Sequence, residues 1–148
     1  MISKIYFMQL TKHFTVEELT RSTAARNLSI DNTPNKSEMA NLKLLAETVL
    51  EPLREAFGHP IIVNSGFRCA AVNKAVGGVR TSQHMLGQAA DIRTLSNTPE
   101  DNKALFETAA SLVRAGKINV GQLIDEYGYS WVHISTPGKH VNNVIHIK

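Results

Sequence analysis

Apolar residues recur at three- and four-residue steps between residues 39 and 57, which predicts a long amphipathic helix. Gly58 is expected to end this helix, and Pro52 is expected to kink or split it near Val49. The predicted buried stripe consists of Met39, Leu42, Leu45, Ala46, Val49, Leu53 and Phe57.

A second helical pattern follows later in the chain. Thr98 is a suitable cap, Pro99 fits the first helical position, and Gly116 marks the end. The predicted inner face consists of Leu105, Phe106, Ala109, Leu112 and Val113.

Short apolar runs bounded by turn residues predict the strands. Ile61–Val63 and "AADI" are two of them, and "VGQLIDE", "SWVHIS" and "NVIHIK" cluster near the end of the chain. Near the start, "FTVEELTRSTAARN" predicts one short helix that is opened by Thr15. Because helices come first and strands cluster late, we expect an α+β fold, a small antiparallel sheet with helices packed on one side.

Composition narrows the class of protein. A chain of 148 residues with 43% hydrophobic and 20% charged residues predicts a single globular domain, residues 1–148. The net charge of +3 suits an anionic partner, but without a lysine/arginine tract we expect no nucleic-acid partner. No segment approaches the roughly 20 apolar residues of a membrane span, and the first residues lack the pattern of a signal peptide. We therefore expect a monomer, made in the cytoplasm, that does not associate with membranes.

His84 and Asp91 frame the most informative segment, "SQHMLGQAAD". In a continuous helix, seven steps would separate these residues by roughly 10 Å along the axis. That is too far for ligands of one ion, because metal bonds from nitrogen or oxygen are about 2.0–2.2 Å long. The chain must turn between them, and Gly87 allows this. Taken alone, the pair also fits ordinary hydrogen-bonded side chains in a loop.

His133 is the candidate third ligand. It lies in the apolar segment "WVHIS", where a histidine can equally be a hydrogen-bonded core residue. Two histidines and one carboxylate are nevertheless a known catalytic zinc set, with the fourth position left to water. Zinc lowers the pKa of that water to about 7.

Glu126 and Asp125 are the candidates for a general base. If "QLIDE" and "WVHIS" form a hairpin with a two- or four-residue loop, Glu126 pairs with Trp131 and shares a sheet face with His133. A three-residue loop or a bulge would exchange the two acids. Glu126 is the preferred candidate, and two solvated acids beside a turn remain the alternative.

Arg68 and Ser82 are the candidate substrate-binding residues. Arg68 follows a strand and "SGF", on a turn that can overhang the ion. A guanidinium there can stabilise the negative charge that develops on a carbonyl oxygen, or it can bind a substrate carboxylate. Ser82 precedes His84 by two positions and can face the same cleft.

These segments together resemble a known family. "SGFR", "VNKAVGG", "SQHMLGQAAD", "QLIDE" and "WVHIS" are similar to the zinc D-alanyl-D-alanine metallopeptidases, whose wider group includes phage cell-wall endopeptidases and the hedgehog signalling domain. The likeness covers about residues 14–135 and points to the compact phage and bacterial branch. It implies His84, Asp91 and His133 as ligands of one zinc ion, and Arg68 as the group that polarises the scissile carbonyl or holds the substrate.

The general base is where the sequence departs from many relatives. These often place the catalytic carboxylate three residues before the last histidine, and that position is Ser130 here. In the compact branch the acid usually comes from the preceding strand, which matches Glu126. The remaining histidines match no ligand position, although His140 and His146 are close enough in sequence to stay spare candidates.

The resemblance implies a zinc peptidase that hydrolyses peptidoglycan stem peptides or their cross-links. A phage endolysin that waits in the cytoplasm and reaches the cell wall after release fits the small size and mild basicity. Two alternatives remain open: a bacterial D-Ala-D-Ala carboxypeptidase that acts on soluble peptides, and a non-catalytic zinc-containing binding or phage structural domain. The presence of Glu126 and Arg68 argues against the last, because a pseudoenzyme tends to lose the acid or the arginine.

Overall fold

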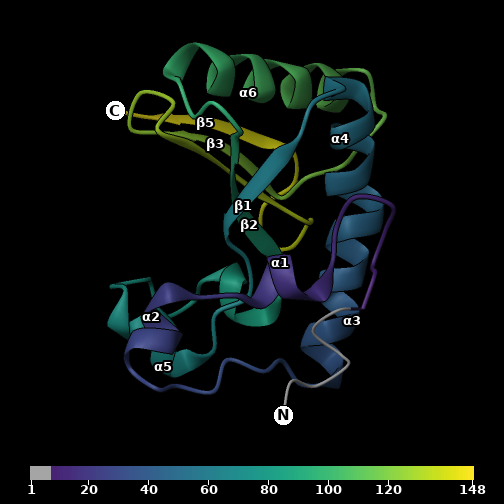
Figure 1. Cartoon of the computed structure of the whole chain (residues 1–148). Coiled ribbons are helices and arrows are strands. Elements are labelled where there is room, and N and C mark those ends of the chain that lie inside the picture. Colours follow the sequence, from purple (N-terminus) through teal and green to yellow (C-terminus); the bar gives the residue numbers. More distant parts are fainter. Residues whose placement is uncertain (1–7) are drawn as a thin grey trace.

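The computed structural model describes residues 8–148 and shows the predicted α+β class (Figure 1). Six α-helices, two short helices of other types and five strands follow one another in these residues. The elements are α1 (Val16–Thr20), α2 (Thr23–Asn27), α3 (Lys36–Leu45), the π-helical η2 (Ala46–Leu50), α4 (Glu51–Phe57), β1 (Ile61–Ser65), α5 (Ala70–Ala75), the 3₁₀-helical η3 (Gln83–Leu86), β2 (Ala89–Thr94), α6 (Pro99–Arg114), β3 (Gln122–Glu126), β4 (Trp131–Ser135) and β5 (Asn143–Ile147).

The five strands form one sheet in the order β1-β2-β4-β3-β5. Every neighbouring pair is antiparallel except β3 and β5, which run parallel, so the sheet is mixed where a purely antiparallel one was expected. The cause is strand order. Both edges of β4 are already occupied, by β2 and β3, so the strand that follows it pairs with the free edge of β3 instead. A strand that runs antiparallel to β4 is necessarily parallel to β3.

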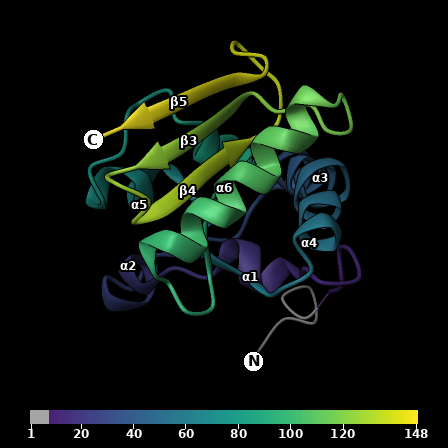
Figure 2. The same ribbon diagram turned by 90° about the horizontal axis from the view of Figure 1, so that it is seen from above.

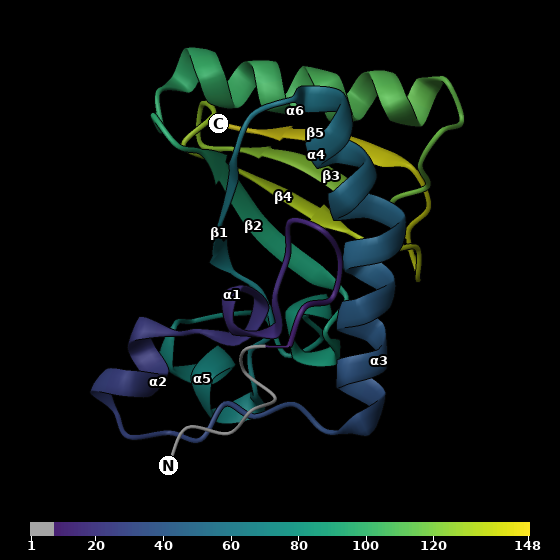
Figure 3. The same cartoon turned by 45° about the vertical axis from the view of Figure 1, so that its right-hand side comes forward.

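The long helical pattern forms α3, η2 and α4, which follow one another as one continuous column (Figure 3). Asn35 and Glu38 form a reciprocal capping box at its start. A kink or split was expected near Val49. The structure has a π-helical stretch there, Ala46–Leu50, which ends two residues before Pro52. A wider turn there accommodates the proline, which cannot donate a backbone hydrogen bond, without breaking the helix.

Helix α6 lies across one face of the sheet (Figure 2) and packs on β2, β3 and β4. Thr98 caps it as predicted, through a bond from the backbone N–H of Asp101 to the Thr98 hydroxyl. Its predicted inner residues Leu105, Phe106 and Ala109 are buried, whereas Leu112 and Val113 are only partly so.

The inner face of α6 also contains Asn102, which is fully buried and was not predicted. Its amide oxygen accepts from the backbone N–H of Thr94 at 2.9 Å and from the Thr94 hydroxyl at 2.8 Å. Its amide nitrogen donates to the carbonyl of Tyr129 at 2.9 Å. A single side chain thus ties α6 to the end of β2 and to the β3–β4 turn.

The N-terminal segment forms two short helices where one was expected. Thr15 caps α1 as predicted, but the helix ends at Thr20, and the Ser22 hydroxyl caps α2 by accepting from the N–H of Ala25. Together with α5, these helices lie at the end of the molecule opposite α6 (Figures 1 and 3). In residues 8–148, no helix combines the length and the apolar character needed to cross a membrane.

Candidate metal centre

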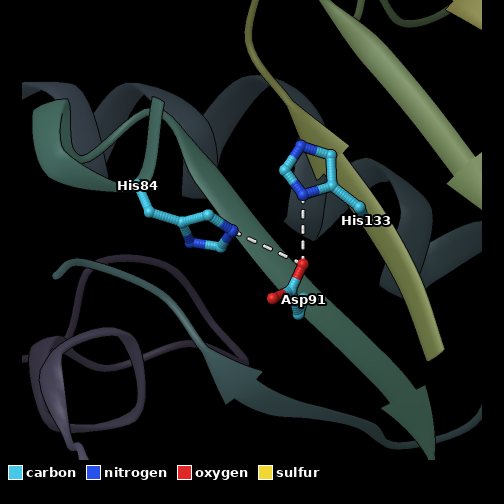
Figure 4. A group of neighbouring side chains, drawn as sticks. All are labelled: His84, Asp91 and His133. Carbon is cyan, nitrogen blue, oxygen red and sulfur yellow. Dashed lines mark hydrogen bonds and ion pairs between the residues drawn. The ribbon is translucent and has the colours of Figure 1, made fainter. Parts of the chain in front are cut away.

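Asp91 and His133 lie directly opposite each other on the neighbouring strands β2 and β4. Side chains alternate along a strand, so both project from the same face of the sheet. Their neighbours Ile92 and Val132 are fully buried in the core beneath α6, so Asp91 and His133 project from the other face. His133 Nδ1 is 3.0 Å from Asp91 Oδ1 (Figure 4).

His84 reaches the same carboxylate from the short helix η3, which precedes β2. Gly87 ends η3 with φ of 74°, a conformation that favours glycine, and the chain then turns into the strand. His84 is almost completely buried, and its Nε2 is 3.4 Å from Asp91 Oδ1. Its Nδ1 is 2.7 Å from the carbonyl oxygen of Gly66 and donates to it. This bond fixes the tautomer and leaves Nε2 free to bind a metal.

The donor atoms of His84, Asp91 and His133 all lie within 4.8 Å of one another, and this is the only such group in the described part of the chain. A tetrahedral ion with bonds of about 2.1 Å holds its donors roughly 3.4 Å apart. The two measured separations, 3.0 and 3.4 Å, are close to this value. The His84–Gly66 bond is the outer contact that metal-binding histidines usually make. The three residues therefore fit a zinc ion with one open position.

The charge state of Asp91 suits a ligand. Burial alone would raise its pKa, but the neighbouring imidazoles of His133 and His84 outweigh burial and hold the pKa well below the ordinary value. The side chain is thus an anion at neutral pH, and it can bind a cation.

Glu126 lies on the same sheet face as His133, in the next residue pair of that face. The β3–β4 hairpin pairs Glu126 with Trp131 and Ile124 with His133, across the four-residue loop 127–130. This is the register expected for a four-residue loop. Burial raises the pKa of the Glu126 carboxyl, and the negative charges of Asp91 and Asp125 add to the effect. A carboxylate with a raised pKa is a stronger base than an ordinary glutamate.

Asp125 points to the opposite face, toward α6. It is buried and accepts hydrogen bonds from the backbone N–H of Tyr129 at 2.6 Å and from His146 Nδ1 at 3.2 Å. The alternative base is thus engaged in holding the hairpin and the last strand together. His146 is engaged with it, away from the metal-binding group.

Arg68 and Ser82 adjoin the metal-binding group. The backbone N–H of Arg68 donates to the carbonyl of His84 at 3.1 Å, and Arg68 Nη2 is 3.4 Å from Ser82 Oγ. The buried Nε of Arg68 has no hydrogen-bond partner among residues 8–148. Burial lowers the pKa of this guanidinium, and the negative charge of Asp91 opposes that effect. The guanidinium of Arg68 is therefore within electrostatic reach of Asp91.

Asn32 supports Arg68 and was missed by the sequence analysis. Its amide nitrogen donates to the carbonyls of Thr20 at 2.8 Å and Phe67 at 3.0 Å. Its amide oxygen accepts from the backbone N–H of Cys69 at 2.8 Å. The residue lies in a polar segment that was interpreted only as a link. An asparagine among other turn residues carries no signal that would have identified it.

Other histidines have separate environments. His13 pairs with Glu51 at 2.6 Å, and His59 packs edge-on against Phe57. His140, the second spare candidate, lies on the loop between β4 and β5, outside the three-residue group.

Comparisons with known proteins agree with this geometry. The profile of the family described as Peptidase M15 matches residues 12–135. The zinc D-Ala-D-Ala carboxypeptidase of Streptomyces albus G is 50% identical over 44 residues, which are 29% of this chain and 17% of that protein. The match thus spans less than a fifth of the length of this relative.

Proposed function

Because the chain belongs to the peptidase M15 family, we propose that it is a zinc peptidase that hydrolyses peptide bonds in bacterial peptidoglycan. Membership confirms the resemblance inferred from the sequence. The substrate is a stem peptide or its cross-link. The observation that carries the proposal is the convergence of His84, Asp91 and His133 within 4.8 Å, with Glu126 on the same sheet face.

Each residue has a chemical role in this proposal. His84, Asp91 and His133 would hold the zinc ion, which would supply a water with a pKa lowered to about 7. Glu126 accepts a proton from the attacking water and passes it to the leaving amine. Arg68 donates hydrogen bonds to the carbonyl oxygen as negative charge develops there, or holds a substrate carboxylate. Ser82, next to Arg68, is placed to bind the same part of the substrate.

We further propose that the protein serves as a phage endolysin, made in the cytoplasm and active on the cell wall after release. The net charge of +3 supports this role, because it suits an anionic polymer. A D-Ala-D-Ala carboxypeptidase that acts on soluble peptides is the second candidate. It is supported by the 50% identity over 44 residues to a protein named for that activity.

The proposal is tested by incubating the zinc-loaded protein with purified peptidoglycan and identifying the released fragments by mass spectrometry. We expect fragments that disappear with a chelator and return with added zinc. Release of terminal alanine alone would identify a carboxypeptidase, and cleaved cross-links an endopeptidase. The absence of fragments from both peptidoglycan and soluble stem peptides would overturn the proposal.

A substitution of the proposed base tests the mechanism. Glu126→Gln keeps the size of the side chain but cannot accept a proton, so we expect a loss of turnover of about 10²-fold or more with zinc affinity retained. Glu107→Gln, on the exposed surface of α6, is the matched control and should have normal activity. Normal turnover in Glu126→Gln would assign the base to another group.

A further inference from the structure

A cleft of about 600 Å³ opens beside the metal-binding group. Its walls include His133, Ser82, Gln83 and Gln122, together with residues of the loop that joins β4 to β5. Because a proposed zinc ligand forms part of its wall, a peptide held at the metal can place neighbouring residues in this cleft.

The β4–β5 loop, residues 136–142, is held in place at both ends. Near β4, Gln83 Nε2 donates to the carbonyl of Thr136 at 3.0 Å, and the Thr136 N–H donates to the carbonyl of Gln88 at 3.0 Å. Near β5, the Asn142 N–H donates to the carbonyl of Val120 at 2.6 Å, and the Val120 N–H donates to Asn142 Oδ1 at 2.9 Å. Hydrogen bonds therefore anchor both ends of the loop that forms this wall of the cleft.

Lys139 and His140 lie at this tip, and both line the cleft. Neither side chain forms an ion pair or hydrogen bond with residues 8–148. The other polar lining groups in the described chain include three glutamines but no aspartate or glutamate. The cleft thus combines an unpaired positive charge with neutral hydrogen-bond donors, an arrangement that favours an anionic group of a ligand.

We propose that this cleft binds a carboxylate of the substrate peptide, with Lys139 as the cation that selects it and His140 as a neighbouring donor. The inference rests on the proposed function, because it names the substrate feature recognised beside the same metal. Stem peptides offer three sources of this group: the carboxylate at the chain end, a carboxylate on a diamino-acid side chain, and the α-carboxylate of the γ-linked glutamate. A chain-end carboxylate in the cleft means carboxypeptidase action, whereas a side-chain carboxylate is compatible with cleavage inside a cross-link.

Four stem pentapeptides separate these sources: one with every carboxylate free, and three that are amidated at the chain end, on the diamino-acid side chain or at the glutamate α-carboxylate. The measured quantity is kcat/KM of the zinc-loaded protein for each. We expect one of the three amidations to lower kcat/KM by about two- to five-fold, the range of exposed ion pairs. Lys139→Ala should abolish that preference and Lys139→Glu should reverse it. Lys103→Ala, on the exposed surface of α6, should leave it unchanged.

A binding measurement keeps this inference separate from the proposed function. Calorimetry with zinc-loaded Glu126→Gln reports whether the free carboxylate strengthens binding and whether adding Lys139→Ala removes the effect. Carboxylate-dependent binding without hydrolysis by the wild type would support the inference and overturn the proposed function. Hydrolysis that ignores all three amidations, or a preference that survives Lys139→Ala, would overturn the inference alone.

Discussion

Substituting Gly66 by alanine should weaken zinc binding although Gly66 is not a ligand. Its carbonyl accepts the bond from His84 Nδ1 at 2.7 Å that orients the imidazole. A Cβ at residue 66 would overlap the carbonyl oxygen of Leu19 and lie 2.9 Å from its carbonyl carbon. These are backbone atoms of α1, which cannot swing aside as the tip of a side chain can. The chain at residue 66 must therefore shift, and His84 loses its partner.

The expected magnitude follows from both effects. Loss of an outer hydrogen bond to a metal-binding histidine typically lowers metal affinity 10- to 100-fold. At about 1.36 kcal/mol per factor of ten, this is roughly 1.4–2.7 kcal/mol of binding free energy. The overlap with α1 should separately lower the free energy of unfolding by about 1–3 kcal/mol. The same shift would strain the 2.7 Å bond from the Phe67 N–H to the Leu19 carbonyl.

Zinc affinity is measured by competition with a chromophoric chelator, and stability by urea unfolding of the metal-free protein. Gly58→Ala is the control. Gly58 has φ of 76° but no atom near its Cβ position, so its substitution should cost about 1 kcal/mol of stability through backbone strain alone. We expect both variants to be less stable and only Gly66→Ala to bind zinc more weakly. A folded Gly66→Ala with wild-type zinc affinity would refute the reasoning.

Three further predictions concern other parts of the structure. Arg68→Ala should lower kcat/KM about 10²-fold with zinc content unchanged, because it removes a donor to the developing oxyanion. Zinc content is measured by atomic absorption, and loss of the metal would show that the arginine has a structural role instead. Asn102→Ala should lower the free energy of unfolding in urea by about 2–4 kcal/mol, because it leaves the buried N–H and hydroxyl of Thr94 without their acceptor; a loss below 1 kcal/mol would contradict this. Burial would raise the pKa of Glu51, but hydrogen bonds from His13 outweigh it and hold the pKa below the ordinary value. The stability that Glu51 contributes is therefore complete above its unfolded pKa and lost as the pH falls, so wild type should lose more stability than Glu51→Gln between about pH 5 and pH 3 in urea titrations.

The sequence predicts those parts of the site that are determined by residues close together in the chain. Gly87 between His84 and Asp91 indicates a turn, and the alternation in "WVHIS" places His133 on one face of a strand. The hairpin register that brings Glu126 to this face requires a two- or four-residue loop. The sequence is also compatible with a three-residue loop, which would exchange Glu126 and Asp125. The roles of Glu126, Arg68 and Ser82 stay predictions until the variants are measured.

Features that depend on distant contacts were not predictable. The parallel pairing of β5 with β3 follows from which strand edges remain free, and this is a property of the whole sheet. The bonds of Asn102 to residues of β2 and of the β3–β4 turn exist only after α6 has packed on the sheet. A buried asparagine in a helix looks the same in sequence as an exposed one.

The bonds of Asn32 bear on how far this protein can be shortened. Every side chain proposed to act lies at or beyond Arg68, so a fragment that starts at Asn35 would retain the complete catalytic set by inspection. Such a fragment would lack the partner of the Phe67 carbonyl and of the Cys69 N–H, the two backbone groups that flank the arginine. The segment that contains Asn32 is therefore structural support for the backbone on either side of Arg68, although it supplies none of the side chains proposed to act.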